Sequence, residues 1–174
     1  MLAGIDERRC VTMDLITIGW REWIGMPELG IAGLKVKVDT GARTSSLHAY
    51  DVEIFRRGSK DLVRFTLHPI QRDTKVTVHC ESLLLEQRTV RSSNGARELR
   101  PVIQTPIEVA GHCWPIEITL TSRDAMGFRM LLGREAIRRR CLVDSGRSYL
   151  VNRHLKPKRK SIKPKHKPRS SSQS

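Results

Sequence analysis

The clearest pattern in the sequence is an alternation of apolar and polar positions that leads into a short polar loop. Leu34, Val36 and Val38 alternate with lysines, which is the period of two typical of a half-buried β-strand. Alternation resumes over residues 47–55, after a polar turn. The pattern therefore predicts one strand, loop and strand unit whose first strand runs directly into Asp39.

The rest of the chain has the pattern of a series of short strands with one late helix. A first patterned segment covers residues 15–23, and only Arg134–Arg140 has a helical pattern. Such a succession predicts an all-β fold, built as a closed or partly closed barrel with one short C-terminal helix. Further strands are expected at residues 62–67, 75–80, 82–90, 102–109 and 114–121.

The loop itself has the sequence Asp39-Thr40-Gly41-Ala42. A strand that ends in an aspartate can deliver a carboxylate to the floor of a cleft, glycine permits the tight turn that follows, and the threonine hydroxyl can fasten the loop. An Asp-x-Gly after a strand is also a common ordinary turn, in which the aspartate caps a backbone amide. The motif resembles the active-site loop of aspartic peptidases.

Several longer blocks, in order along the chain, extend this resemblance. They are VDTGARTSSLHAYDVEIF, VRFTLHPIQRD, WPIEITLTSRDAMGFRMLLGREAI and VDSGRSYL. Together they are similar to a family of bacterial retropepsin-like aspartic endopeptidases, formerly labelled ATP-dependent zinc proteases and associated with glutamate ligases. The resemblance covers about residues 15–151 and implies a single-lobe retropepsin-like acid-protease barrel with Asp39, Thr40 and Gly41 as catalytic residues. It also implies that Leu131-Leu132-Gly133 and the helix after it pack behind the loop, and that residues 62–91, with Arg72, Lys75, Arg88 and Arg91, form a basic flap.

Aspartic hydrolysis needs two carboxylates that share a proton, whereas the chain offers one clear copy of the motif. The resemblance implies that Asp39 of a second subunit supplies the other, so a homodimer or higher oligomer is expected. Asp144, in Asp144-Ser145-Gly146, is a rival within the chain. Too little sequence follows it to build a second lobe, so a structural role is favoured.

Four residues near the loop are candidates for binding substrate or supporting the loop, namely Ala42, Arg43, His48 and Arg134. A guanidinium can form a two-pronged hydrogen bond to a substrate carboxylate. Arg43 could equally hold the loop through an ion pair with Glu81 or Asp144, and the sequence leaves this open.

Positive charge is concentrated at the C-terminal end of the chain, which separates a basic tail from the rest. The net charge is +14, and residues 151–174 hold nine Lys or Arg and no acid, which leaves +5 for the remainder. The expected organisation is a flexible leader over residues 1–13, a peptidase domain over 14–151 and a disordered basic tail over 152–174. The basic body favours an acidic peptide or protein substrate. The tail is either a contact for RNA or the ribosome or a solubilising appendage.

Other motifs limit the chemistry. The sequence has no G-x-x-x-x-G-K-[ST] loop and no H-E-x-x-H pair, so no cofactor and no metal are predicted. Four separated cysteines indicate free, mostly buried thiols. Without an apolar run or export signal, a cytoplasmic protein without membrane contact is expected. A non-catalytic module that binds acidic peptide or the ribosome, and a metal-dependent protease, are the alternative functions.

Overall fold

The computed structural model describes residues 15–70, 76–91, 95–122 and 127–156. Strands dominate this part of the chain, and its one α-helix is four residues long. The predicted all-β fold with a short late helix is therefore confirmed. The elements in chain order are β1 (Ile16–Gly19), β2 (Arg21–Met26), η1 (Pro27–Leu29), β3 (Ile31–Asp39), β4 (Ser45–His48), β5 (Tyr50–Arg57), β6 (Lys60–Leu67), β7 (Val78–Leu83), β8 (Glu86–Arg91), β9 (Arg97–Val109), β10 (His112–Thr121), β11 (Met130–Gly133), α1 (Arg134–Ile137), β12 (Cys141–Asp144) and η2 (Arg153–Leu155).

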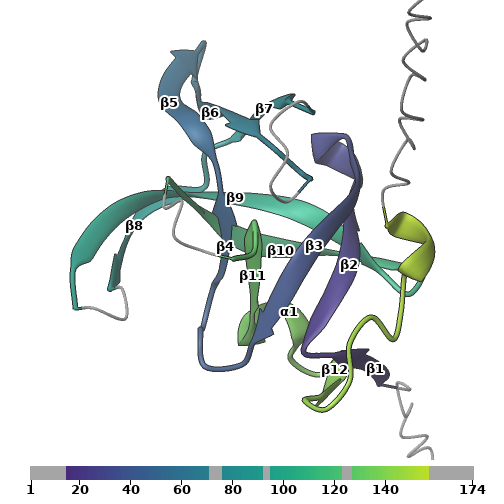
Figure 1. Cartoon of the computed structure of the whole chain (residues 1–174). Coiled ribbons are helices and arrows are strands. Elements are labelled where there is room, and N and C mark those ends of the chain that lie inside the picture. The colour runs from purple at the N-terminus through teal and green to yellow at the C-terminus, as the bar shows by residue number, and fades with distance from the viewer. Residues whose placement is uncertain (1–14, 71–75, 92–94, 123–126, 157–174) are drawn as a thin grey trace, which may run out of the picture.

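The strands form sheets that do not close into a barrel. The largest sheet has the order β10-β4-β11-β3-β2-β9-β8, and β9 also pairs with β10 (Figure 1). This second pairing curls the sheet, but β2 meets β9 through a single residue pair, Gly25 with Glu108. Strands β5, β6 and β7 form a separate sheet, as do β1 and β12. The sequence left open whether the barrel is closed or partly closed, because periodicity locates strands without saying which edges pair, and the structure has the partly closed form.

At the centre of the large sheet, strands that are far apart in the sequence lie side by side. The chain leaves along β3, turns at residues 40–44 and returns as β4, and β11 lies between the two. Strand β11 runs parallel to β3, with Gly133 beside Asp39, and antiparallel to β4. The β3–β4 loop is therefore fixed by a strand that comes about ninety residues later.

The alternation predicted before the loop is present in the structure. Leu34, Val36 and Val38 are buried in the core, whereas Lys37 is exposed. The core continues through β10 to α1, where the buried Trp114 donates its indole N–H to the backbone oxygen of Ala136 at 2.9 Å. The side chains that position β3 therefore belong to the same core that holds α1 in place.

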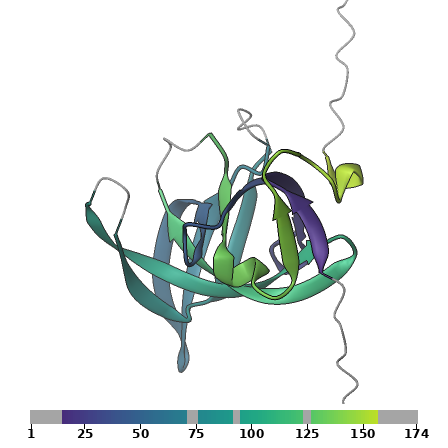
Figure 2. The same ribbon diagram turned by 90° about the horizontal axis from the view of Figure 1, so that it is seen from below.

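The segment 62–91, expected as one flap, is divided between two sheets. Strands β6 and β7 pair with each other, whereas β8 pairs with β9 in a hairpin that projects beside the β3–β4 loop (Figures 1 and 2). The chain passes from one sheet to the other at two leucines. The Leu84 amide donates a hydrogen bond to the backbone oxygen of Asp61 in β6, and the Leu85 amide donates one to the backbone oxygen of Val102 in β9. Among the described residues of this segment, only the β8 part can therefore cover the loop. Arg72 and Lys75 of the expected flap lie outside the described residues.

Residues 147–156, called the return segment below, cross back over β2 and β3. Asn152 is buried, accepts a hydrogen bond from the Ala110 amide and donates one to the Glu108 oxygen. A side chain at Gly33 would place its Cβ 2.0 Å from the Leu155 oxygen, so glycine allows this close approach. The described residues continue past the expected boundary at residue 151, and η2 lies in the segment expected as a disordered tail. Residues 1–13 and 157–174 lie outside the described part, so the leader and the tail beyond Lys156 stay predictions.

Helix α1 is shorter than the predicted Arg134–Arg140. It ends at Ile137, and Arg139 then adopts a left-handed backbone with φ of 59°, which does not continue a right-handed helix. No helix in the described ranges is long and apolar enough to cross a membrane.

The three cysteines in the described residues are all free. Burial raises the pKa of the Cys80 and Cys141 thiols to about 11. Cys113 is exposed, so the prediction of mostly buried thiols holds for Cys80, holds partly for the half-buried Cys141, and is wrong for Cys113. Cys10 lies outside the described part.

Candidate active site

Asp39 ends β3 and is half-buried, with its carboxylate held by its own loop. Its Oδ1 accepts hydrogen bonds from the backbone amides of Gly41 at 3.1 Å and Ala42 at 3.2 Å. The Ala42 amide also lies 3.2 Å from the Asp39 backbone oxygen. These bonds orient one carboxylate oxygen, and no described residue hydrogen-bonds the other. The arrangement can therefore present a fixed carboxylate to a bound molecule.

The loop is supported from behind by β11 and the start of α1. The Arg134 amide donates to the Ala42 oxygen at 2.9 Å, and the Glu135 amide donates to the Arg43 oxygen at 3.1 Å. The Gly133 amide donates to the buried Ser45 hydroxyl at 3.1 Å. Three consecutive amides thus fasten the loop, as the Leu-Leu-Gly resemblance implied.

Gly133 is required at this position by space. A Cβ there would lie 2.6 Å from the Thr44 carbonyl carbon and 2.8 Å from the Arg43 and Thr44 oxygens. Ordinary contacts between such atoms are about 3.5 Å or more. Any larger residue must push the helix and the Asp39 loop apart.

The predicted site residues do not all gather at the loop. Thr40 and Arg43 are exposed, and neither side chain has a hydrogen bond or ion pair with a described residue. Arg134 donates from Nη1 to the Gly41 oxygen at 3.3 Å, so it contacts the loop backbone. Glu81, one of the two ion-pair partners suggested for Arg43, is instead bound by both Nη atoms of Arg57.

His48 lies away from the loop. It is buried at the far end of β4, and its ring packs against Tyr50 with centroids 4.5 Å apart. Met130 pairs with both Leu47 and Val36, so His48 is level with Lys35, four residues before Asp39, and about 13 Å of strand separates the two levels. The geometry therefore does not bring His48 together with Asp39.

A cleft of about 460 Å³ opens beside the loop. Arg88 of β8 crosses it, donating to Thr44 Oγ1 at 3.3 Å and to Glu117 at 2.8 Å. The hydrogen bond with Glu117 is the largest cause that raises the pKa of Arg88. Because Arg88 is already paired, Arg43 is the arginine of this cleft with no described partner. The residues that line the cleft are Arg43, Thr44, Ser45, Arg88, Gln104, Pro115, Ile116, Glu117, Glu135 and Ala136.

Asp144 forms a similar turn in a different setting. Its Oδ1 accepts a hydrogen bond from the Gly146 amide at 2.9 Å. It lies on β12, which pairs with β1 in a two-stranded sheet, and within the described residues no further strand pairs with β12, whereas β11 pairs with the strand of Asp39. The geometry agrees with a structural turn.

Sequence reasoning missed Ser45, which supports the Asp39 loop, and Glu22, which fixes the return segment. Ser45 gave no signal because no sequence motif marks a buried hydroxyl that accepts a hydrogen bond from one backbone amide. Glu22 is 1% exposed, and its carboxylate accepts hydrogen bonds from the amides of Gly19, Leu150 and Val151. A glutamate at an inward position of a strand is the one sequence signal that could have identified it. Within the described ranges, no three His, Cys, Asp or Glu side chains are grouped as metal ligands, and metal independence stays a prediction.

Similar proteins share most of the described part of the chain. Probable alpha-L-glutamate ligases from Shewanella halifaxensis and Parasynechococcus marenigrum are each 48% identical over 134 residues, which are 77% of this chain and 29% of theirs. One from Desulfotalea psychrophila is 46% identical over 127 residues, covering 73% of this chain and 27% of its own. The chain thus spans less than a third of the length of these relatives.

A solved structure has the same fold. A Legionella pneumophila protein of unknown function aligns with a TM-score of 0.64 at 24% identity, over 78% of this chain and 97% of its own. The family model described as "Retropepsin-like aspartic endopeptidase RimB" matches residues 17–154. With that match over most of its length, and with Asp39 at the end of a strand that pairs with β11, the chain belongs to the RimB-like family of retropepsin-like proteins.

Proposed function

We propose that the protein is an aspartic endopeptidase whose active site forms when two chains bring their Asp39 carboxylates together. The observation that carries the proposal is the construction of the Asp39 loop. One carboxylate oxygen is bound by two amides, and three further amides from β11 and α1 fasten the loop behind it. Such support preorganises a carboxylate, which is what general acid and base catalysis requires.

A pair of carboxylates is needed because the reaction requires two opposite proton transfers. An ionised Asp39 accepts a proton from water as the water oxygen attacks the peptide carbonyl carbon, while a protonated Asp39 of the partner subunit donates a proton to the carbonyl oxygen. The C–N bond then breaks as the amine takes the proton from the first Asp39 and a hydroxyl of the tetrahedral intermediate returns a proton to Asp39 of the partner subunit, which restores the starting pair. In the described residues, Asp39 is the only aspartate on a loop supported in this way, so the second copy comes from a second subunit.

The proposed substrate is an acidic protein segment, such as one that carries added glutamates. Arg43 presents an exposed guanidinium in the cleft next to the loop, with no described partner. The curated relatives are named probable alpha-L-glutamate ligases, which makes glutamate-containing chains a reasonable substrate class. Binding of a substrate glutamate by Arg43 would place the neighbouring peptide bond near Asp39.

A second candidate function is a non-catalytic module that holds an acidic segment for a ligase. The observation that favours it is the naming of the curated relatives as ligases, together with the small share of their length that this chain matches. In that case Arg43 would still bind acidic peptide, but Asp39 would perform no chemistry.

The test is peptide cleavage by the full chain and by Asp39→Asn, with glutamate-rich peptides, in the presence and absence of a chelator. Asparagine keeps the oxygen that accepts the two loop amides, so the variant is expected to fold. The peptidase proposal expects cleavage that chelator leaves unchanged and that Asp39→Asn lowers by several orders of magnitude. Equal cleavage by the variant would refute the proposal, chelator-sensitive cleavage would indicate a metal-dependent protease, and binding without cleavage would indicate the module.

A further inference from the structure

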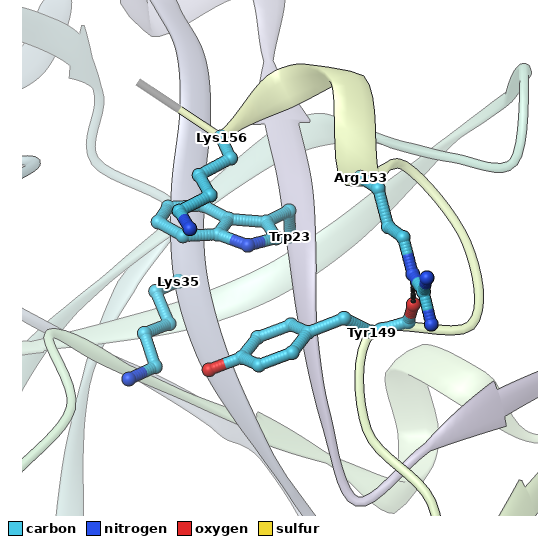
Figure 3. A pocket seen from close by; sticks show the side chains of 5 residues that line it. All are labelled: Trp23, Lys35, Tyr149, Arg153 and Lys156. Atoms are coloured by element: carbon cyan, nitrogen blue, oxygen red, sulfur yellow. Dashed lines mark hydrogen bonds between the residues drawn. The ribbon is translucent and has the colours of Figure 1, made fainter. Parts of the chain in front are cut away.

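A pocket of about 350 Å³ lies between β2, β3 and the return segment, and combines two aromatic rings with three basic side chains. Figure 3 shows the rings of Trp23 and Tyr149 lying one above the other, with Lys35 and Lys156 near one edge and Arg153 near the other. The ring centroids are 6.2 Å apart, and the ring planes differ by 27°. We call this site the Trp23 pocket; it is lined by Trp23, Lys35, Tyr149, Arg153 and Lys156.

The pocket is held open by buried polar contacts that fix the return segment. The buried Glu22 carboxylate accepts hydrogen bonds from the Leu150 amide at 2.7 Å and the Val151 amide at 3.4 Å. The Tyr149 amide donates to the Arg21 oxygen at 2.9 Å. Because a buried carboxylate needs such donors and the backbone needs such acceptors, the position of Tyr149 opposite Trp23 is well determined.

The charges around the pocket are all of one sign. Its lining contains no acid, and Lys35, Arg153 and Lys156 make no ion pair with a described residue. The Lys35 ammonium lies 4.9 Å from the ring centre of Phe128 and 5.9 Å from that of Tyr149. Directly after Lys156, residues 157–174 add seven Lys or Arg and no acid. The pocket is thus one end of a continuous basic stretch of chain.

We propose that the Trp23 pocket binds single-stranded nucleic acid, with a base stacked on Trp23 and Tyr149 and phosphates on the basic residues. Stacking on aromatic rings beside a cationic surface is how proteins hold single strands without reading sequence. Trp23 and Tyr149 are both half-buried and line the pocket, so a base that enters it can reach their rings. An acidic peptide would use the same cations but not the stacked faces, so the rings favour nucleic acid. This inference does not depend on peptidase activity.

The experiment titrates a fluorescein-labelled single-stranded RNA of about 12 nucleotides with the full chain at several salt concentrations. Because one stacked base contributes about 1 to 3 kcal/mol, Trp23→Leu is expected to weaken binding about 5- to 150-fold with an unchanged salt slope. Lys35→Gln is expected to reduce the slope of log K against log salt by about 0.7. Phe55→Leu is the matched control, since Phe55 is a half-exposed ring beside Arg64 on the separate β5–β7 sheet.

Each outcome decides the proposal. Loss of affinity in Trp23→Leu but not in Phe55→Leu, with weaker binding of an RNA duplex of the same sequence, supports stacking in the pocket. Tyr149→Leu gives the same test should Trp23→Leu fail to fold. Wild-type affinity in both pocket variants overturns the proposal and assigns any RNA binding to the basic tail alone. Binding of a glutamate-rich peptide that Lys35→Gln weakens, without RNA binding, overturns it in favour of an acidic-peptide site.

Discussion

Gly133→Ala is the substitution whose effect the structure determines most directly. The added Cβ would lie 2.6 Å from the Thr44 carbonyl carbon, whereas carbon atoms in contact are usually about 3.5 Å apart. Helix α1 and the Asp39 loop must therefore separate by about 0.9 Å. The hydrogen bonds that the Arg134 and Glu135 amides donate to the loop are now 2.9 and 3.1 Å long. They would lengthen beyond the hydrogen-bond range, which ends at about 3.2 Å.

The expected loss of stability follows from these contacts. Two backbone hydrogen bonds contribute about 1 kcal/mol each, and overpacking costs about 1 to 3 kcal/mol, so the free energy of unfolding should fall by about 3 to 5 kcal/mol. Urea unfolding followed by circular dichroism measures this; with a slope of about 1 to 3 kcal/mol/M, the midpoint should fall by more than about 1 M. The matched control is Gly127→Ala, where an added Cβ meets nothing within 4 Å. Equal midpoints for the two variants would refute the reasoning.

Three further predictions follow from the described contacts. Glu22→Ala removes a buried carboxylate that accepts three backbone amides, so the free energy of unfolding should fall by about 3 kcal/mol or more in urea unfolding; a change below about 1 kcal/mol would contradict this. Arg43→Gln should lower kcat/KM about 10- to 100-fold for peptides with glutamate but not for matched peptides with glutamine, given about 1.5 to 3 kcal/mol for a charged hydrogen bond; equal losses on both would argue against recognition by Arg43. The thiols of Cys80 and Cys141, whose pKa values are about 11 instead of 9.0, keep their protons in the folded state above pH 9, where the unfolded state loses them. Their contribution to stability is therefore complete below pH 9 and is lost as the pH rises to 11. Mass spectrometry after treatment with iodoacetamide at pH 9 should show Cys113 labelled before Cys80 and Cys141; faster labelling of Cys80 would contradict this.

The sequence was sufficient for the local parts of the fold. The strand into Asp39 could be predicted because its apolar residues alternate and its outward lysines mark the exposed face. The short helix could be predicted from Arg134 onward, but not its end, because the left-handed backbone at Arg139 has no glycine to signal it. The sequence did not decide between a closed and a partly closed barrel, since edge pairing is set by contacts between distant strands.

The candidate site could be predicted only where one stretch of sequence builds it. The turn at Asp39 is local, and the hydrogen bonds from two backbone amides to its carboxylate follow from the Asp-Thr-Gly sequence. His48 was grouped with the loop because it is close in sequence, but a strand carries it away from the carboxylate. The Trp23 pocket was not predicted, because Trp23 and Tyr149 are joined across the fold by the buried Glu22.

The most direct test of the paired-carboxylate account is a mixing experiment. Wild type and Asp39→Asn are unfolded, refolded together in varying ratios at constant total concentration, and assayed on a glutamate-rich peptide. If each active site needs one Asp39 from each of two chains, cleavage should fall with the square of the wild-type fraction. A linear fall would show that a single chain carries a complete site, and would contradict the account.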